Sequence, residues 1–139
     1  FGGGLSLAAQ ISSSGLGIWI GNSLLILSTV PPILLILAVA TLIIFLTEIT
    51  SNVTTTTTFL PVFGALAIAI GVLPVSLTVP VCLAASCAFM LPVATPPNAI
   101  VYGSNKFTIA TMMRAGFALN IVGILVVTIF AYYFAPLIF

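Results

Sequence analysis

The chain has 139 residues, of which 62% are hydrophobic and 2% are charged, and its formal net charge is +1. A soluble domain carries about 25% charged residues, so this composition excludes an ordinary water-facing surface, and the lack of a basic patch argues against a nucleic-acid partner. With no histidine and one carboxylate, Glu48, general acid/base chemistry and His/Cys metal sites are disfavoured, and we do not expect an enzyme. The composition predicts an all-α membrane protein surrounded by lipid.

Residues 1–29 mix apolar side chains loosely with Ser, Gly, Gln and Asn. We expect an interfacial, amphipathic arm, with Trp19 at the level of the lipid headgroups. The chain opens at Phe1 in a Gly-rich apolar run, without the cationic start of a signal peptide. We therefore expect it to be a piece of a longer protein.

Residues 30–72 predict a re-entrant helical hairpin. The Pro-Pro pair at 31–32 suits the first turn of a helix. The apolar run Ile33–Leu46 covers roughly 21 Å at ~1.5 Å per residue, which is less than the ~30 Å hydrocarbon core. A polar stretch at 47–58 and a second apolar arm at 59–70 follow. The polar tip between these short arms would lie at mid-membrane, where non-helical backbone must be buried in protein or face water.

Residues 73–104 predict a transmembrane helix that is broken near its middle. The apolar run at 73–91 is interrupted by Pro80 and ends in a Pro-rich segment. In that segment Thr95 suits an N-cap, and the two prolines after it suit the first turn of the second half.

A loop at 103–114 contains both cations, Lys106 and Arg114, and it is counted as 105–114 where the broken helix is taken to end at 104. The positive-inside rule predicts that this loop is cytoplasmic. Residues 115–139 then form the final transmembrane helix, with a tyrosine pair near its end at the other interface. This topology makes the protein an integral, multi-pass membrane protein with its C-terminus outside.

Two helix breaks at mid-membrane are the best sequence indication of a transporter site. A broken helix leaves N–H groups unpaired at one new end and carbonyls at the other. The N–H end suits an anion, and the carbonyl end suits a small hard cation such as sodium. The candidate functional residues are Ser51 and Asn52, which provide a hydroxyl and an amide at the first break, and Thr95 at the second, flanked by the carbonyls of Ala94 and Pro96.

Three polar features allow alternatives. The hydroxyls of Thr54–Thr58 either bond carbonyls within their own helix or contribute to a polar stripe that lines a water-filled path. Glu48 is a counter-charge for sodium or a proton carrier, or it ties helix ends or a partner outside this chain. Lys106 and Arg114 are best explained as topology determinants.

Two motifs carry a family resemblance. The segment Thr47-Glu48-Ile49-Thr50-Ser51-Asn52-Val53 resembles the second Ser-Asn-Thr motif of the divalent anion:sodium symporter family. Residues 88–99, AFMLPVATPPNA, resemble that family's long signature, and the opening FGGG also matches. Val53 stands where the motif often has Thr, although some members that handle di- and tricarboxylates also have Val there. The choice between dicarboxylate, citrate and sulfate therefore stays open.

The resemblance implies a secondary transporter that moves di- or tricarboxylate anions, such as succinate or citrate, together with sodium. It also implies a homodimeric elevator-type carrier, in which this chain is the second inverted repeat and pairs with an N-terminal half. By the same resemblance, Ser51, Asn52 and Thr95 bind substrate carboxylate, beside Val53 and Pro96. The implied sodium ligands, partly through backbone carbonyls, are Thr47, Thr50, Asn52 and Ala94.

The alternatives to this function belong to three kinds. The first is an anion exchanger of the same architecture, and the second is a sulfate- or arsenite-type permease. The third is a channel or a structural membrane subunit that does not transport.

Overall fold

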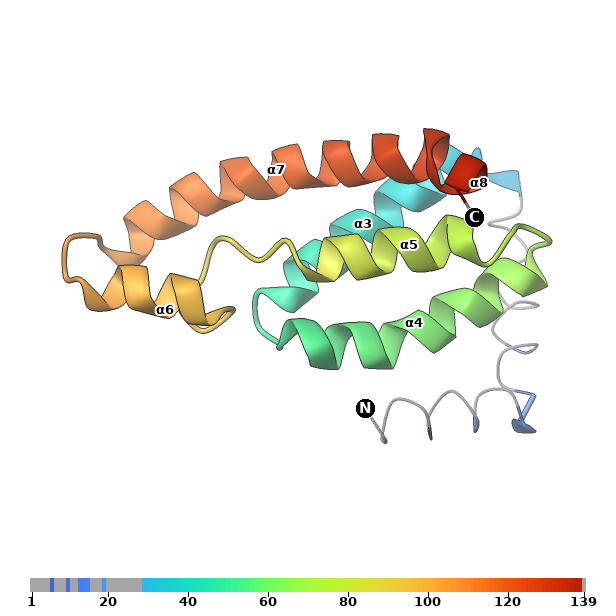
Figure 1. The fold of residues 1–139 in the computed structure, drawn as a ribbon, viewed down its shortest axis with the longest axis horizontal. Helices are drawn as coiled ribbons and strands as arrows, with labels where there is room; N and C mark the ends of the chain where they lie inside the picture. The colour runs from blue at the N-terminus through green and yellow to red at the C-terminus, as the bar shows by residue number, and fades with distance from the viewer. Residues whose placement is uncertain (1–5, 7–9, 11–12, 16–18, 20–28, 139) are drawn as a thin grey trace.

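The computed structural model describes residues 6, 10, 13–15, 19 and 29–138, and the secondary-structure elements of these residues are all helices (Figure 1). The all-α class is therefore confirmed for the described part of the chain. The interfacial arm expected over 1–29 lies mostly outside the described residues, although Trp19 is described and is exposed. The helices are α3 (Pro32–Thr47), α4 (Asn52–Ala69), α5 (Val75–Ala85), α6 (Pro96–Gly103), α7 (Ile109–Tyr133) and α8 (Ala135–Ile138).

Helices α3 and α4 are two arms joined by the tip turn, residues 48–51. Helix α3 begins at Pro32, as predicted, because the N–H that proline lacks would be unpaired in a first turn in any case. The second arm is longer than expected, since α4 begins at Asn52 and includes the threonine run. Within that run, the hydroxyl of Thr57 donates to the Val53 carbonyl at 2.8 Å, which is the intrahelical alternative.

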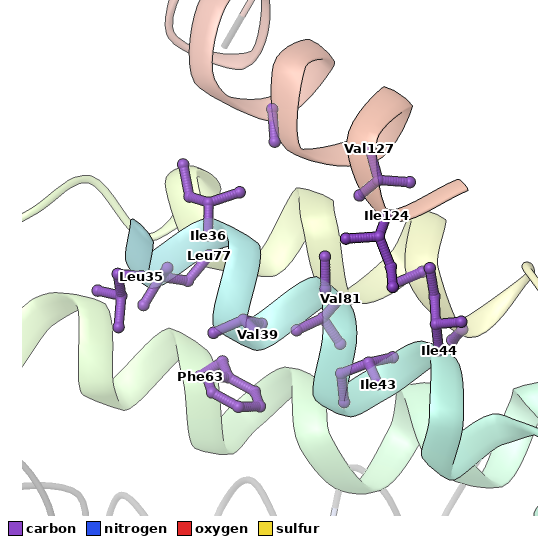
Figure 2. Packing of buried hydrophobic residues seen from close by; sticks show 14 of the residues in the cluster. Leu35, Ile36, Val39, Ile43, Ile44, Phe63, Leu77, Val81, Ile124 and Val127 are labelled. Atoms are coloured by element: carbon purple, nitrogen blue, oxygen red, sulfur yellow. The ribbon is translucent and has the colours of Figure 1, made fainter. Parts of the chain in front are cut away.

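Helix α5 lies between the two arms, and it contacts α3 and α4 more extensively than these arms contact each other (Figure 1). Helix α7 packs on α3 and α5 from the other side. The hydrophobic cluster buried between them is aliphatic apart from Phe63 (Figure 2). Because lipid chains are as apolar as these side chains, close packing and polar contacts hold such helices together in a bilayer.

Two details of the broken helix differ from the sequence-based expectation. Pro80 is buried inside α5 and does not interrupt it. Helix α5 ends at Ala85 and not near Leu91, so the α5–α6 break covers residues 86–95. The second half begins as predicted, because Thr95 is the N-cap of α6 and prolines occupy its first turn.

Helix α7 begins at Ile109, six residues before the expected start at 115. Thr108 caps it by accepting the N–H of Thr111 at 3.2 Å, and this local cap extends the helix toward the cations. Arg114 therefore lies in α7 and not in a loop, whereas Lys106 precedes the helix.

Among the described helices, α4 and α7 are long and apolar enough to cross a membrane. Helices α3 and α5 have 16 and 11 residues. At ~1.5 Å per residue, each of these two is shorter than the ~30 Å hydrocarbon core. Because α4, the second arm of the expected hairpin, is long enough to cross, the re-entrant path of residues 30–72 stays a prediction.

Candidate anion-binding site at two helix breaks

Both helix breaks border one hollow of about 550 Å³, here called the inter-break hollow. It lies between the first turn of α4 and the α5–α6 break, and no charged side chain is among the described residues that line it. Its lining brings together all the predicted anion-site residues, from two segments far apart in the sequence. The lining residues are Ser51, Asn52, Val53, Ser86, Ala88, Phe89, Ala94, Thr95, Pro96, Pro97 and Asn98.

Two capped helix N-termini meet at this hollow. Ser51 has extended backbone, and its hydroxyl oxygen accepts the N–H of Thr54 at 3.1 Å. Thr95 is also extended, and its hydroxyl oxygen accepts the N–H of Asn98 at 3.4 Å. Both residues are of the type that caps helices because their backbone is non-helical and their oxygen replaces a missing carbonyl.

From the hollow, α4 and α6 run away in opposite directions (Figure 1). Each N-terminus carries a partial positive charge of roughly half an elementary charge. An anion between them is therefore stabilised by both helices, by about 0.3–1 kcal/mol each and up to ~2 kcal/mol where partly buried. Two such ends suit a small anion without any cationic side chain.

Thr47 links three helix ends beneath the hollow. Its side chain is fully buried, and Oγ1 lies 2.9 Å from the Ala85 carbonyl oxygen and 3.0 Å from Oδ1 of Asn52. A hydroxyl has one proton, so it donates to one of these oxygens at a time. The end of α3, the start of α4 and the end of α5 are thereby fixed against one another.

Of the other two predicted cation ligands, Ala94 lines the hollow and Thr50 does not. The Thr50 hydroxyl donates to the Leu46 carbonyl at 3.0 Å and pairs with the hydroxyl of Thr55. Ala94 is buried and lines the hollow from the α5–α6 break. Together with Thr47 and Asn52, these residues offer hydroxyl, amide and carbonyl oxygens, which are the ligands that hard cations take.

Glu48 ties helix ends together, which is one of the roles left open by the sequence. Its carboxylate is buried and accepts the N–H groups of Phe89 at 2.8 Å, Met90 at 3.0 and 3.1 Å, and Leu91 at 3.1 Å. It also accepts Nδ2 of Asn120 on α7 at 2.7 Å. All of these partners are N–H donors. An ionised carboxylate only accepts hydrogen bonds, so it matches this set of donors.

Three residues that support the second break were not singled out in the sequence. Nδ2 of Asn98 donates to the carbonyls of Ala88 at 2.9 Å and Leu91 at 3.0 Å, across the α5–α6 break. Gly116 of α7 lies so close to the break that an added Cβ would be 2.5 Å from Cα of Met90. Asn120 of α7 is the third such residue. The sequence contained a signal for it, because a polar amide inside an apolar membrane helix indicates a structural or functional role.

Comparison with family sequence models matches residues 1–139 to the sodium:sulfate symporter transmembrane region. The chain belongs to this family, which consists of transporters rather than enzymes, and the family resemblance is thereby confirmed. The protein is accordingly an integral membrane protein.

Two curated relatives are both named sodium-dependent dicarboxylate transporter SdcS. The Staphylococcus saprophyticus protein is 46% identical over 136 residues, which cover 98% of this chain and 26% of that protein. The Staphylococcus aureus (strain MRSA252) protein is 46% identical over 138 residues, or 99% of this chain and 26% of that protein. The chain thus spans about a quarter of the length of these relatives.

Proposed function

We propose that this chain supplies one half of the substrate site of a sodium-coupled transporter for dicarboxylates such as succinate, or tricarboxylates such as citrate. The observation that carries the proposal is the convergence of two capped helix N-termini on one hollow without charged side chains. The names of its relatives support the choice of carboxylate and of sodium.

In this proposal the hydroxyl and amide groups of Ser51, Asn52 and Thr95 bind one substrate carboxylate. Val53 and Pro96 line the same hollow and set its apolar shape. Sodium, as a co-transported ion, takes oxygen ligands from Thr47, Thr50, Asn52 and Ala94. Carboxylate and sodium then neutralise each other within a low-dielectric site, where an attraction between charges is strong.

The proposed architecture follows the family resemblance. Residues 30–72 form a re-entrant hairpin, 73–104 a broken transmembrane helix, and α7, which begins at Ile109, the final span of a second inverted repeat. An N-terminal half completes the site in an elevator-type homodimer. Lys106, which precedes α7, and Arg114, near the start of α7, lie on the cytoplasmic side, and the C-terminus lies outside.

Uptake by proteoliposomes tests this function. The full-length protein that carries this chain is expected to accumulate radiolabelled succinate only when a sodium gradient points inward, with saturation at high succinate. Citrate and sulfate as competitors then rank the substrates. Uptake that needs an internal counter-anion instead of sodium would identify an exchanger, and flux that never saturates would identify a channel; either result would contradict the proposal.

Replacing Thr95 with alanine is expected to raise the succinate KM about tenfold, because the α6 N-terminus loses its cap and the anion loses a hydroxyl. Thr108→Ala is the matched control. It removes the corresponding cap of α7, which does not line the hollow, and each lost cap costs about 1 kcal/mol of stability. Equal KM values for the two variants would show that the cap at residue 95 has no part in binding.

A further inference from the structure

In the α5–α6 break, three consecutive backbone N–H groups have no acceptor within a helix. They belong to Phe89, Met90 and Leu91, and all three point to the one carboxylate of Glu48. That carboxylate comes from the tip turn, 41 to 43 residues away in sequence. A single side chain thus replaces the acceptors that a continuous helix would have supplied.

Helix α7 also holds the Glu48 carboxylate, in addition to the backbone of the α5–α6 break. Nδ2 of Asn120 donates to it at 2.7 Å, and the side chain of Asn120 is fully buried. One helical turn before it, Gly116 allows α7 to approach Phe89 and Met90 at backbone contact. The break is therefore enclosed between the tip turn and α7, with Glu48 at the point where the three segments meet.

Glu48 itself does not line the inter-break hollow, whereas Phe89, Ala94 and Thr95 do. Its carboxylate is occupied by donors, so it is not placed to bind substrate. It acts on the hollow only through the backbone that it holds. This separation distinguishes Glu48 from the residues assigned above to the anion and to sodium.

We infer that Glu48 is a positioning residue: its carboxylate holds the unwound break so that Ala94 and Thr95 face Ser51 and Asn52. The inference rests on the proposed transport function. It assigns to the carboxylate no proton transfer and no direct contact with sodium. Asn120 supports the same positioning role, because its amide fixes the Glu48 carboxylate to α7.

Hydrogen exchange and uptake by the full-length protein, applied to Glu48→Gln, test this role. Glutamine offers one acceptor oxygen and turns an NH2 toward donors, so at least one charge-assisted hydrogen bond is lost. The amides at 89–91 are expected to exchange about tenfold faster or more, and the succinate KM is expected to rise by a similar factor. Thr57→Val is the matched control, because that hydroxyl bonds only carbonyls of its own helix.

Asn120→Ala provides a second, milder test in case the Glu48 variant does not fold. It removes one of the four donor groups and is expected to raise exchange at the same three amides to a smaller extent. Unchanged exchange at 89–91 in both variants would overturn the inference, whatever happens to uptake. Faster exchange with unaltered KM values for succinate and sodium would also overturn it.

Two further outcomes separate this inference from its alternatives. A Glu48→Gln protein that keeps slow exchange at 89–91 but loses the pH dependence of uptake would identify a proton carrier and overturn the positioning role. Absence of sodium-driven uptake in the unaltered protein would overturn the proposed function. That failure is recognisable because the amide protection at 89–91 would remain intact.

Discussion

Sodium-driven succinate uptake is expected to fall by about 100-fold or more when Asn52 is replaced by alanine. Asn52 opens α4, lines the inter-break hollow and lies 3.0 Å from the Thr47 hydroxyl. The variant loses one contact to the anion and one oxygen near the cation, and a hydrogen bond to a charged group is worth about 1.5–3 kcal/mol. Uptake is measured in proteoliposomes and normalised to the amount of inserted protein.

Asn105→Gly is the matched control for this variant. Asn105 is exposed and has a φ of +58°, which glycine adopts without strain, so uptake is expected to stay unchanged. Asn52→Asp adds a sharper test, because it keeps the shape of the side chain but puts a negative charge beside the anion. Normal uptake by either Asn52 variant would refute the assignment of this residue to the site.

Gly116→Ala is expected to destabilise the protein and impair uptake, whereas Gly123→Ala is not. A Cβ at Gly116 would overlap the backbone of Phe89 and Met90, which no side-chain rotation can relieve. Overpacking of this kind costs about 1–3 kcal/mol. A Cβ at Gly123 would meet the Cys87 side chain at 3.6 Å and Cδ1 of Ile44 at 3.7 Å, which are ordinary contacts, and alanine favours a helix by up to about 1 kcal/mol.

The comparison of these two glycines is informative because both lie in α7 and both face the region of the α5–α6 break. Thermal unfolding in detergent measures stability, and the succinate KM reports the position of the break. We expect a lower Tm and a higher KM for Gly116→Ala alone. Equal behaviour of the two variants would mean that α7 does not fix the break.

The parts of the fold that were predicted correctly are those encoded by neighbouring residues. A helix start needs only a cap and a first turn, so Pro32 and Thr95 could be identified from a few residues around each. The breaks could be located because Pro and polar residues interrupt apolar runs at those places. The start of α7 differs from the prediction although its signal is local, because the Thr108 cap lies between the two cations, a pattern that favours a cytoplasmic loop.

The extent of the second break could not be read from its own residues. The segment at 86–91 is apolar enough to continue α5, but it unwinds in the structure. The N–H groups of residues 89–91 bond to Glu48, a partner distant in sequence. The roles of Asn120 and Gly116 depend in the same way on which helix packs against the break. Long-range pairs such as these are fixed by tertiary packing, which no local pattern records.

The most direct measurement is an electron cryo-microscopy map of the full-length protein in sodium and succinate. Density for the dicarboxylate is expected in the inter-break hollow, with one carboxylate between the N-termini of α4 and α6. Density beside Lys106 or Arg114 instead, or an inter-break hollow that stays empty at saturating succinate, would contradict binding by helix ends.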